Sequence, residues 1–464
     1  MRAKDIEWKL RETYANRCNP DEPLRPDDER NVDIDELNPD ARGVSVVDTI
    51  AERIEISKSP VCELFSGLPG SGKSTELRRL VARLAAPAGA HLLPVIIDAE
   101  ETLDTANPID VADILIAILY HTERALLIAE GATAEAAARD ALSEGRLRRL
   151  WHWVTHLDLE IKSIEFATEA KAEASELGEL SASAKAEFEL RSDPSLRRRI
   201  REKIAAHMTT FLREMKILLR AMEARAKKLG RRGLLIVVDS LEKLRGSSDN
   251  WVEVLRSAEH VFRGNAPYLQ LPVHVLYTVP PAVVLRISLR VHFLPMLKLH
   301  DRAGKRCDGG FDAAWQIVHQ RVPGSVLEVF FGSSWVARIN RLIEWSGGYP
   351  REIVQLLQTF LSSSREIDEP RFDRMISLAA DQHRRTLPDS AFRWLAQVHL
   401  EKRLVIENDE QRETVDLMLQ NNVVLRYQNN DPWADVHPAV LEMPQVAAAI
   451  ALLRRERDVA PSGA

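Results

Sequence analysis

The stretch GLPGSGKST, Gly67 to Thr75, constrains this chain of 464 residues more than any other feature. It matches the pattern G-x-x-x-x-G-K-[ST]. An apolar stretch at 61–66 precedes it, and a segment at 75–84 with leucines at helical spacing follows it. A glycine-rich loop between a strand and a helix directs backbone N–H groups at a phosphate, and the helix dipole favours the same anion. The sequence therefore predicts a strand, a phosphate-binding loop and a helix in succession.

Within this loop the residues divide by chemistry. Gly67, Gly70 and Gly72 supply backbone freedom, Lys73 is expected to reach the β- and γ-phosphates, and the Ser74 hydroxyl is expected to ligate Mg²⁺. The full set of expected nucleotide-binding residues is Gly67, Pro69, Gly70, Ser71, Gly72, Lys73, Ser74 and Thr75.

A second acid must hold the magnesium from across such a site, and two later stretches offer one. Residues 93–98 and 234–239 are typical of buried strands and end in Asp98 and Asp239. The second is the stronger candidate, because five consecutive aliphatic residues precede Asp239, as in buried parallel strands that deliver a residue to the ligand edge. We expect Asp239 to join Ser74 as a metal ligand. Glu242 is the candidate for orienting the attacking water, with an exposed acid in a first helical turn as the alternative.

A small-molecule kinase is a rival interpretation of the same loop. In such kinases an acid on the strand after the loop's helix acts on the acceptor hydroxyl, and Asp98 would take that role. The late position of Asp239 weighs against this interpretation, as does the absence of a compact arginine-rich lid soon after Asp98.

Four features in order resemble the AAA+ and STAND group of P-loop ATPases. They are the loop, the strand ending in Asp239, a strand at 273–278 ending in Thr278, and the helix start GGYPREI from Gly347. The absence of an acid directly after Asp239 makes the chain more similar to STAND members of the KAP and NACHT type, and to prokaryotic regulatory ATPases, than to proteolytic unfoldases.

The resemblance implies ATP and Mg²⁺ as cofactors and a slow or partner-stimulated hydrolysis of ATP. It implies a sensor 1 role for Thr278 and a sensor 2 role for Arg351, although a plain helix start with proline also fits that segment. It further implies self-association through the nucleotide sites, with an arginine finger donated by a neighbouring subunit. Arg286 and Arg290 are the candidates for that finger, and surface arginines on a short helix are the alternative.

The fold class that we expect is α/β: a P-loop parallel-sheet ATPase core with a large helical insertion, an α-helical lid and a C-terminal winged-helix-like module. Helices are expected at 311–322, 334–346 and 350–363 for the lid, and at 391–399 and 410–420, followed by a β-hairpin, for the module. The expected boundaries are 1–43 for a lead-in segment, 44–110 and 233–310 for the core, 111–232 for the insertion, 311–369 for the lid and 370–464 for the module.

Acidic and basic residues of the insertion are concentrated in two separate segments. Residues 157–193 carry 10 acids and 4 bases, whereas residues 195–232 carry 13 bases and 3 acids. The two arms are expected to pair as an antiparallel coiled-coil-like hairpin. A nucleic-acid-binding stripe along 195–232 is the alternative, although Phe211 is the only aromatic residue there to stack on bases.

The C-terminal module carries 12 bases and 14 acids, so contact with a partner or effector protein is favoured over binding to phosphates. The net charge of the chain is −6, its three cysteines show no metal or disulfide spacing, and no membrane-spanning stretch or leader is apparent. A cytoplasmic location without membrane contact is expected.

The leading hypothesis is a nucleotide-dependent oligomeric switch that engages a partner protein, with a role in prokaryotic signalling or antiviral defence suggested by the resemblance alone. The alternatives are a DNA-associated ATPase of the initiator or loader type and the small-molecule kinase that uses Asp98.

Overall fold

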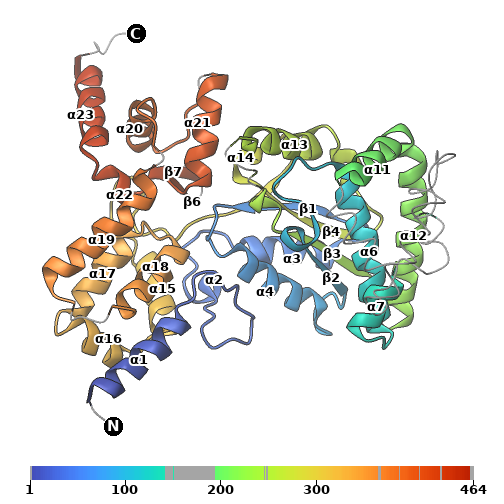
Figure 1. The fold of residues 1–464 in the computed structure, drawn as a ribbon, viewed down its shortest axis with the longest axis horizontal. Helices are drawn as coiled ribbons and strands as arrows, with labels where there is room; N and C mark the ends of the chain where they lie inside the picture. The colour runs from blue at the N-terminus through green and yellow to red at the C-terminus, as the bar shows by residue number, and fades with distance from the viewer. Residues whose placement is uncertain are drawn as a thin grey trace. The chain divides into compact units, whose positions relative to one another are not determined.

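The structure is a computed structural model that divides into two compact units (Figure 1). The P-loop unit comprises residues 1–49, 66–80 and 292–464, and the sheet unit comprises residues 50–65 and 81–291. The residues that the structure describes are 3–141, 150, 194–244, 246, 249–363, 367–385, 387–406, 408–428 and 431–459.

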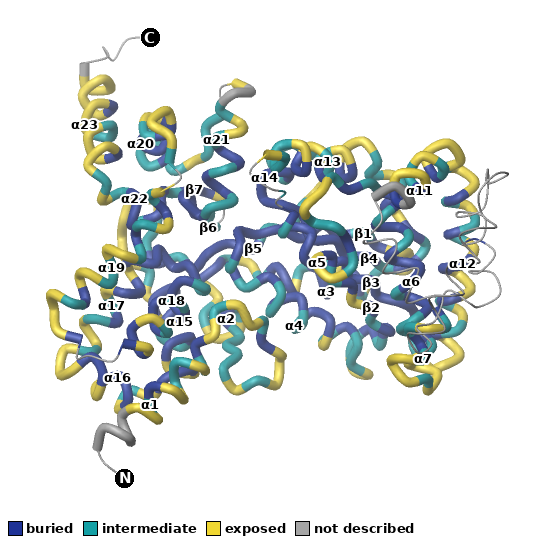
Figure 2. The backbone as a smooth tube through the Cα atoms, viewed as in Figure 1, coloured by how far each residue is buried: buried dark blue, intermediate teal, exposed yellow. Residues whose placement is uncertain are grey.

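A five-stranded sheet has the strand order β2-β3-β4-β1-β5. Strands β2, β3 and β4 are parallel neighbours, with Val95 opposite Ile236 and Ile236 opposite Val275. Five of the six residues of β3 are buried aliphatics, which is the composition expected of a central parallel strand covered on both faces (Figure 2). The strands are β1 (Cys62–Gly67), β2 (Leu93–Asp98), β3 (Leu234–Asp239), β4 (His274–Val279) and β5 (Val291–Leu294).

Helices surround these strands in the sheet unit, and one continuous apolar core joins strands and helices. The long helix α6 packs against β2 and also against α11 and α12, and all three helices come from the insertion. The helices here are α3 (Val46–Ile56), α4 (Lys73–Ala85), α5 (Ala99–Thr102), α6 (Val111–Ala129), α7 (Ala134–Asp140), α11 (Pro194–Ala206), α12 (Met208–Lys228), α13 (Trp251–Arg263) and α14 (Pro281–Val284), with short 3₁₀ turns η1 (Leu241–Lys243) and η2 (Ala266–Leu269). Helices α3 and α4 each begin in the P-loop unit.

The P-loop unit has its own apolar core, built mainly from helices of the lid. Helix α1 packs against α18, and the Arg11 guanidinium lies 4.3 Å from the centre of the Phe330 ring. The helices are α1 (Ala3–Arg17), α2 (Ile34–Leu37), α15 (Asp308–His319), α16 (Gly324–Phe331), α17 (Trp335–Trp345), α18 (Pro350–Leu361) and α19 (Glu369–Arg384).

The C-terminal module belongs to the P-loop unit and has the expected winged-helix-like order of helices and hairpin. Strands β6 and β7 pair antiparallel, with Tyr427 stacked on Trp433 at a ring-centre distance of 4.5 Å. Helices α20 and α23 pack on one another beside this hairpin (Figure 1). The elements are α20 (Ala391–Glu401), α21 (Asp409–Gln420), β6 (Val424–Gln428), β7 (Pro432–Val436), α22 (Pro438–Leu441) and α23 (Pro444–Val459).

The α/β fold class is confirmed, and several local expectations need correction. The sequence pattern predicts one helix over 134–153 and one along the basic arm of the insertion, whereas α7 ends at Asp140 and the basic arm is interrupted at His207 between α11 and α12. The composition of residues 19–42 predicts an extended segment, whereas the short helix α2 lies within it; α1 precedes it. The acidic arm at 157–193, and with it the expected hairpin, lies outside the described residues.

No described helix combines the length and hydropathy needed to cross a membrane.

The attachment of α12 to α6 generates a stability prediction. Arg225 pairs with Glu123, which is buried, at 2.5 Å, and with Glu130 at 2.6 Å. Arg225→Met leaves the Glu123 carboxylate buried without this partner, so we expect the free energy of unfolding to fall by about 3 kcal/mol. Lys227→Met, which removes an exposed pair with Glu223, should change it by less than about 0.5 kcal/mol. Urea unfolding measures both, and equal effects would contradict this role of Arg225.

Candidate nucleotide site

The tip of the P-loop is a tight turn from Leu68 to Ser71. The Ser71 N–H donates to the Leu68 carbonyl at 3.1 Å, and Gly70 has a φ of 77°. Proline at the second position and a positive φ at the third are the features of a type II turn, which explains the Pro69–Gly70 pair. Gly72 also has a positive φ, 99°. These dihedral angles turn the loop into a concave backbone surface.

Helix α4 begins at Lys73, directly after that turn. The first N–H groups of a helix have no intrahelical acceptor, and the helix dipole adds partial positive charge there. The buried Lys73 ammonium donates to the carbonyls of Gly67 at 3.0 Å and Leu68 at 3.1 Å. Backbone donors, a dipole and a lysine thus converge where the sequence predicts phosphates, and these residues fit a nucleotide with its Mg²⁺ at Ser74.

Arg42 fastens the loop to its helix, and this role was missed by the sequence analysis. Its guanidinium donates to the Ser71 carbonyl at 2.8 Å and to the Glu76 carboxylate at 3.0 Å, and all three residues are buried. Burial raises the pKa of Glu76 to about 7, against the opposing charge of Arg42. No local sequence pattern links Arg42 to Glu76, so the lead-in gave no signal for this contact.

The lead-in also reaches the helix behind the loop. The Leu24 N–H donates to the Thr75 hydroxyl at 3.2 Å, and Arg78 donates to the Pro23 carbonyl. Thr75 is therefore bound by protein backbone, whereas Ser74, the expected metal ligand, remains half-buried.

The start of helix α18 packs against the tip of the P-loop. The Arg351 N–H donates to the Gly70 carbonyl at 3.3 Å, and a Cβ atom on Gly70 would lie 2.5 Å from the Tyr349 ring. No side chain fits at Gly70 for this reason. The structure therefore brings Arg351 beside the loop, where a sensor 2 residue is expected, and the Arg351 Nε lies 3.8 Å from the Asp21 carboxylate.

Asp239 and Asp98 lie at the carboxyl ends of adjacent strands and are direct register partners. The Asp98 carboxylate caps the N-terminus of helix α5 by accepting the Glu100 N–H at 2.9 Å, which is a structural role. Asp239 accepts the Ser240 N–H at 2.7 Å, and Ser240 has a φ of 65°, which turns the chain sharply after β3.

Thr278 holds this sharp turn in place. Its buried hydroxyl accepts the Leu241 N–H at 3.0 Å and donates to the Val238 carbonyl at 3.4 Å. Glu242 is buried on the 3₁₀ turn that follows, η1. Asp239, Glu242 and Thr278 thus form one cluster of the sheet unit, and the described contacts of Thr278 are those of a residue that positions the backbone carrying Glu242.

The two candidate finger arginines differ in their surroundings. Arg286 pairs with Glu259 at 3.1 Å, and Glu259 also pairs with Arg263. Arg290 is exposed on the segment just before β5.

The basic arm is partly neutralised within the sheet unit. Arg197 pairs with Asp104 at 2.9 Å, and Arg201 pairs with Asp113 at 2.7 Å. Two of the arginines expected to contact nucleic acid therefore fasten α11 to neighbouring loops and α6, while Arg198 and Arg199 remain exposed.

A buried cluster of Glu352, His383 and His437 has the composition of a metal site. Its hydrogen bonds indicate another role. The Ala439 N–H donates to His437 Nδ1 at 3.1 Å, so the ring proton lies on Nε2, which donates to Glu352 at 2.7 Å and has no lone pair for a metal. Burial alone would raise the pKa of Glu352. The neighbouring His437 and His383 have a larger effect in the opposite direction, and together these effects lower the pKa to about 2. The cluster therefore joins α18, α19 and the residue before α22 through a carboxylate shared by two imidazoles.

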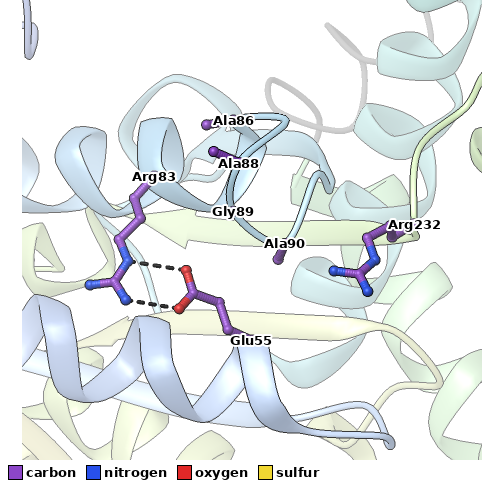
Figure 3. Close-up of a pocket in the computed structure, with 7 residues that line it drawn as sticks. All are labelled: Glu55, Arg83, Ala86, Ala88, Gly89, Ala90 and Arg232. Atoms are coloured by element: carbon purple, nitrogen blue, oxygen red, sulfur yellow. Dashed lines mark hydrogen bonds and ion pairs between the residues drawn. The ribbon is translucent and has the colours of Figure 1, made fainter.

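An open cleft of about 450 Å³ lies elsewhere in the sheet unit (Figure 3). Its residues Ala90 and Arg232 precede β2 and β3, so it lies at the amino ends of the strands, opposite the edge that carries Asp239. Arg83 and Glu55 form a bidentate ion pair there, at 3.0 and 2.8 Å. The lining residues are Glu55, Arg83, Ala86, Ala88, Gly89, Ala90 and Arg232.

No protein-family model and no curated protein matches this chain. Among solved structures it is similar to the ORC2 protein of Aeropyrum pernix in complexes with ADPNP and ADP, at 11% identity and a TM-score of 0.36, over 95% of this chain and 98% of that one. It is also similar to CDC6P of Pyrobaculum aerophilum, at 12% identity and a TM-score of 0.32, with the same coverage of both chains.

The hydroxyl of Thr278 gives a prediction that separates positioning from packing. Thr278→Val removes the acceptor of the buried Leu241 N–H, so we expect a loss of about 1–3 kcal/mol in the free energy of unfolding. Thr278→Ser keeps the hydroxyl and should retain the amide protection of Leu241 in hydrogen exchange. Equal protection of Leu241 in the valine and serine variants would contradict the role of the hydroxyl.

Proposed function

We propose that this chain is an AAA+-type ATPase that binds Mg-ATP, hydrolyses it slowly and uses the nucleotide state as a switch. The observation that carries the proposal is the P-loop tip, where a type II turn, the start of α4 and the buried Lys73 converge. The start of α18 packs on that tip. This contact supports a role for Arg351 of the lid in sensing the γ-phosphate.

Each part of the site has a task in this proposal. The loop amides and Lys73 would hold the phosphates, and Ser74 and Asp239 would hold Mg²⁺, which neutralises charge on the transferred phosphoryl group. Glu242 would orient the attacking water, since its backbone is fixed by the turn that Thr278 clamps. Asp98 is committed to capping α5, which disfavours the small-molecule kinase.

Self-association through the nucleotide sites is part of the proposal, with Arg290 as the trans-acting finger. A finger must be exposed and able to exchange its contacts for phosphate oxygens. Arg290 is exposed, whereas Arg286 is held by an ion pair with Glu259.

The partner is proposed to be a protein that contacts the net-negative C-terminal module. A STAND-like switch and an initiator-like ATPase share the nucleotide chemistry, and they differ in whether DNA is bound. The pairing of Arg197 and Arg201 with acids of the sheet unit reduces the basic stripe on which DNA binding would depend.

The first test is turnover of ATP by the purified chain. Lys73→Ala should abolish Mg-ATP binding. Glu242→Gln should bind normally and hydrolyse roughly 10²–10⁴ times more slowly, because the residue that orients the water is lost. Glu253→Gln, a change of an exposed acid on α13, is the matched control and should behave as wild type. Unchanged binding and turnover in Lys73→Ala would refute the proposal.

The finger is tested by mixing two inactive variants. Lys73→Ala keeps Arg290 and lacks a working site, and Arg290→Ala keeps the site and lacks the finger. If Arg290 acts in a neighbouring subunit, the mixture should recover part of the ATPase rate that neither variant shows alone. Arg286→Ala should retain turnover. Wild-type turnover by Arg290→Ala, or a mixture without recovery, would rule out Arg290 as the finger.

A further inference from the structure

The six residues Gly347–Glu352 lie between the P-loop and the C-terminal module, and we refer to them as the linker turn. On one side, Tyr349 and Arg351 contact Gly70 of the loop. On the other side, the Gly347 carbonyl accepts the Tyr427 hydroxyl of β6 at 2.6 Å. At its far end Glu352 accepts the ring N–H of His437, which precedes α22, at 2.7 Å. Loop and module therefore share one short segment, within a single compact unit.

Asn422 of the module also contacts the P-loop directly. It lies in the turn between α21 and β6 with a φ of 52°, and only 6% of it is exposed. Its side-chain amide donates to the Pro69 carbonyl at 3.2 Å and to the Tyr349 hydroxyl at 3.0 Å. One buried amide thus ties together the module, the loop tip and the linker turn.

The direction of the Pro69 carbonyl gives this contact a consequence for phosphate binding. In a trans peptide the C=O and the following N–H point in opposite directions. Because Asn422 holds the Pro69 carbonyl, the Gly70 N–H points away from the module. The second carbonyl of the tip, that of Gly70, is held in turn by the Arg351 N–H. The module and the linker turn therefore bind loop carbonyls, which orients loop amides away from them.

We propose that the C-terminal module is an allosteric element of the nucleotide site, and that Asn422 and Tyr349 are positioning residues which hold the P-loop tip in its phosphate-binding form. This inference rests on the proposed nucleotide binding and adds its regulation. A nucleotide in the loop stabilises the seated module, and a partner that displaces the module weakens nucleotide binding by the same factor, because coupling between two binding events is reciprocal.

The test compares three variants with the wild-type chain. Asn422→Gly removes the amide and tolerates the positive φ, so it leaves the backbone unstrained. Tyr349→Phe removes only the hydroxyl and keeps the ring against Gly70. Asn408→Gly, in the same module, removes the N-terminal cap of α21 and is the matched control, with a cost of a few tenths of a kcal/mol. Calorimetry measures the affinity for a non-hydrolysable ATP analogue with Mg²⁺, and hydrogen exchange follows the amides of β6 with and without the analogue.

We expect Asn422→Gly and Tyr349→Phe to bind the analogue roughly three- to tenfold more weakly, the range for one hydrogen bond, and Asn408→Gly to bind as wild type. The analogue should slow exchange in β6 of the wild type and of Asn408→Gly, and should do so less in Asn422→Gly. Two results would overturn the inference while leaving nucleotide binding intact. One is that both Asn422→Gly and Tyr349→Phe bind the analogue with wild-type affinity. The other is that the analogue does not change hydrogen exchange in β6 of the wild-type chain. Absence of binding in the wild type would instead refute the proposed function.

Discussion

The turn at Gly70 is the constraint on which the proposed site depends. A φ of 77° and the lack of a Cβ atom allow the chain to reverse between Leu68 and Ser71 and allow the Tyr349 ring to approach the backbone. Any side chain at this position would collide with the linker turn and would strain the backbone. Gly70 therefore gives the P-loop its turn and also leaves room for the lid to pack against the loop.

A second sharp turn organises the acids of the sheet unit. Ser240 takes a left-handed conformation directly after Asp239, and the Thr278 hydroxyl binds the backbone on either side of it. The left-handed region is uncommon for a residue with a side chain, and such strain persists where surrounding contacts enforce it. A buried hydroxyl with two backbone partners is a contact of that kind, and it connects β4 to the position of Glu242.

The sequence predicted the elements whose signals are local. The glycines of the P-loop and the aliphatic run before Asp239 each depend on neighbouring residues, and the corresponding loop and strand were found, as was the β-hairpin expected after residue 420. Contacts between distant segments had no such signal. Arg42 binds Ser71 and Glu76, and Asn422 binds Pro69, because of tertiary packing that no spacing encodes. The sequence shows a surplus of bases at 195–232, but the acids that pair with Arg197 and Arg201 lie far away along the chain.

The most direct test of the account measures the free energy of unfolding at increasing concentrations of a non-hydrolysable ATP analogue in the presence of Mg²⁺. A ligand that binds the native state alone stabilises it by about 2.7 kcal/mol at 100 times its Kd. The account predicts a rise of this size in the wild-type chain and no rise in Lys73→Ala. A wild-type stability that does not change with the analogue, or an equal rise in Lys73→Ala, would contradict a nucleotide site at the P-loop.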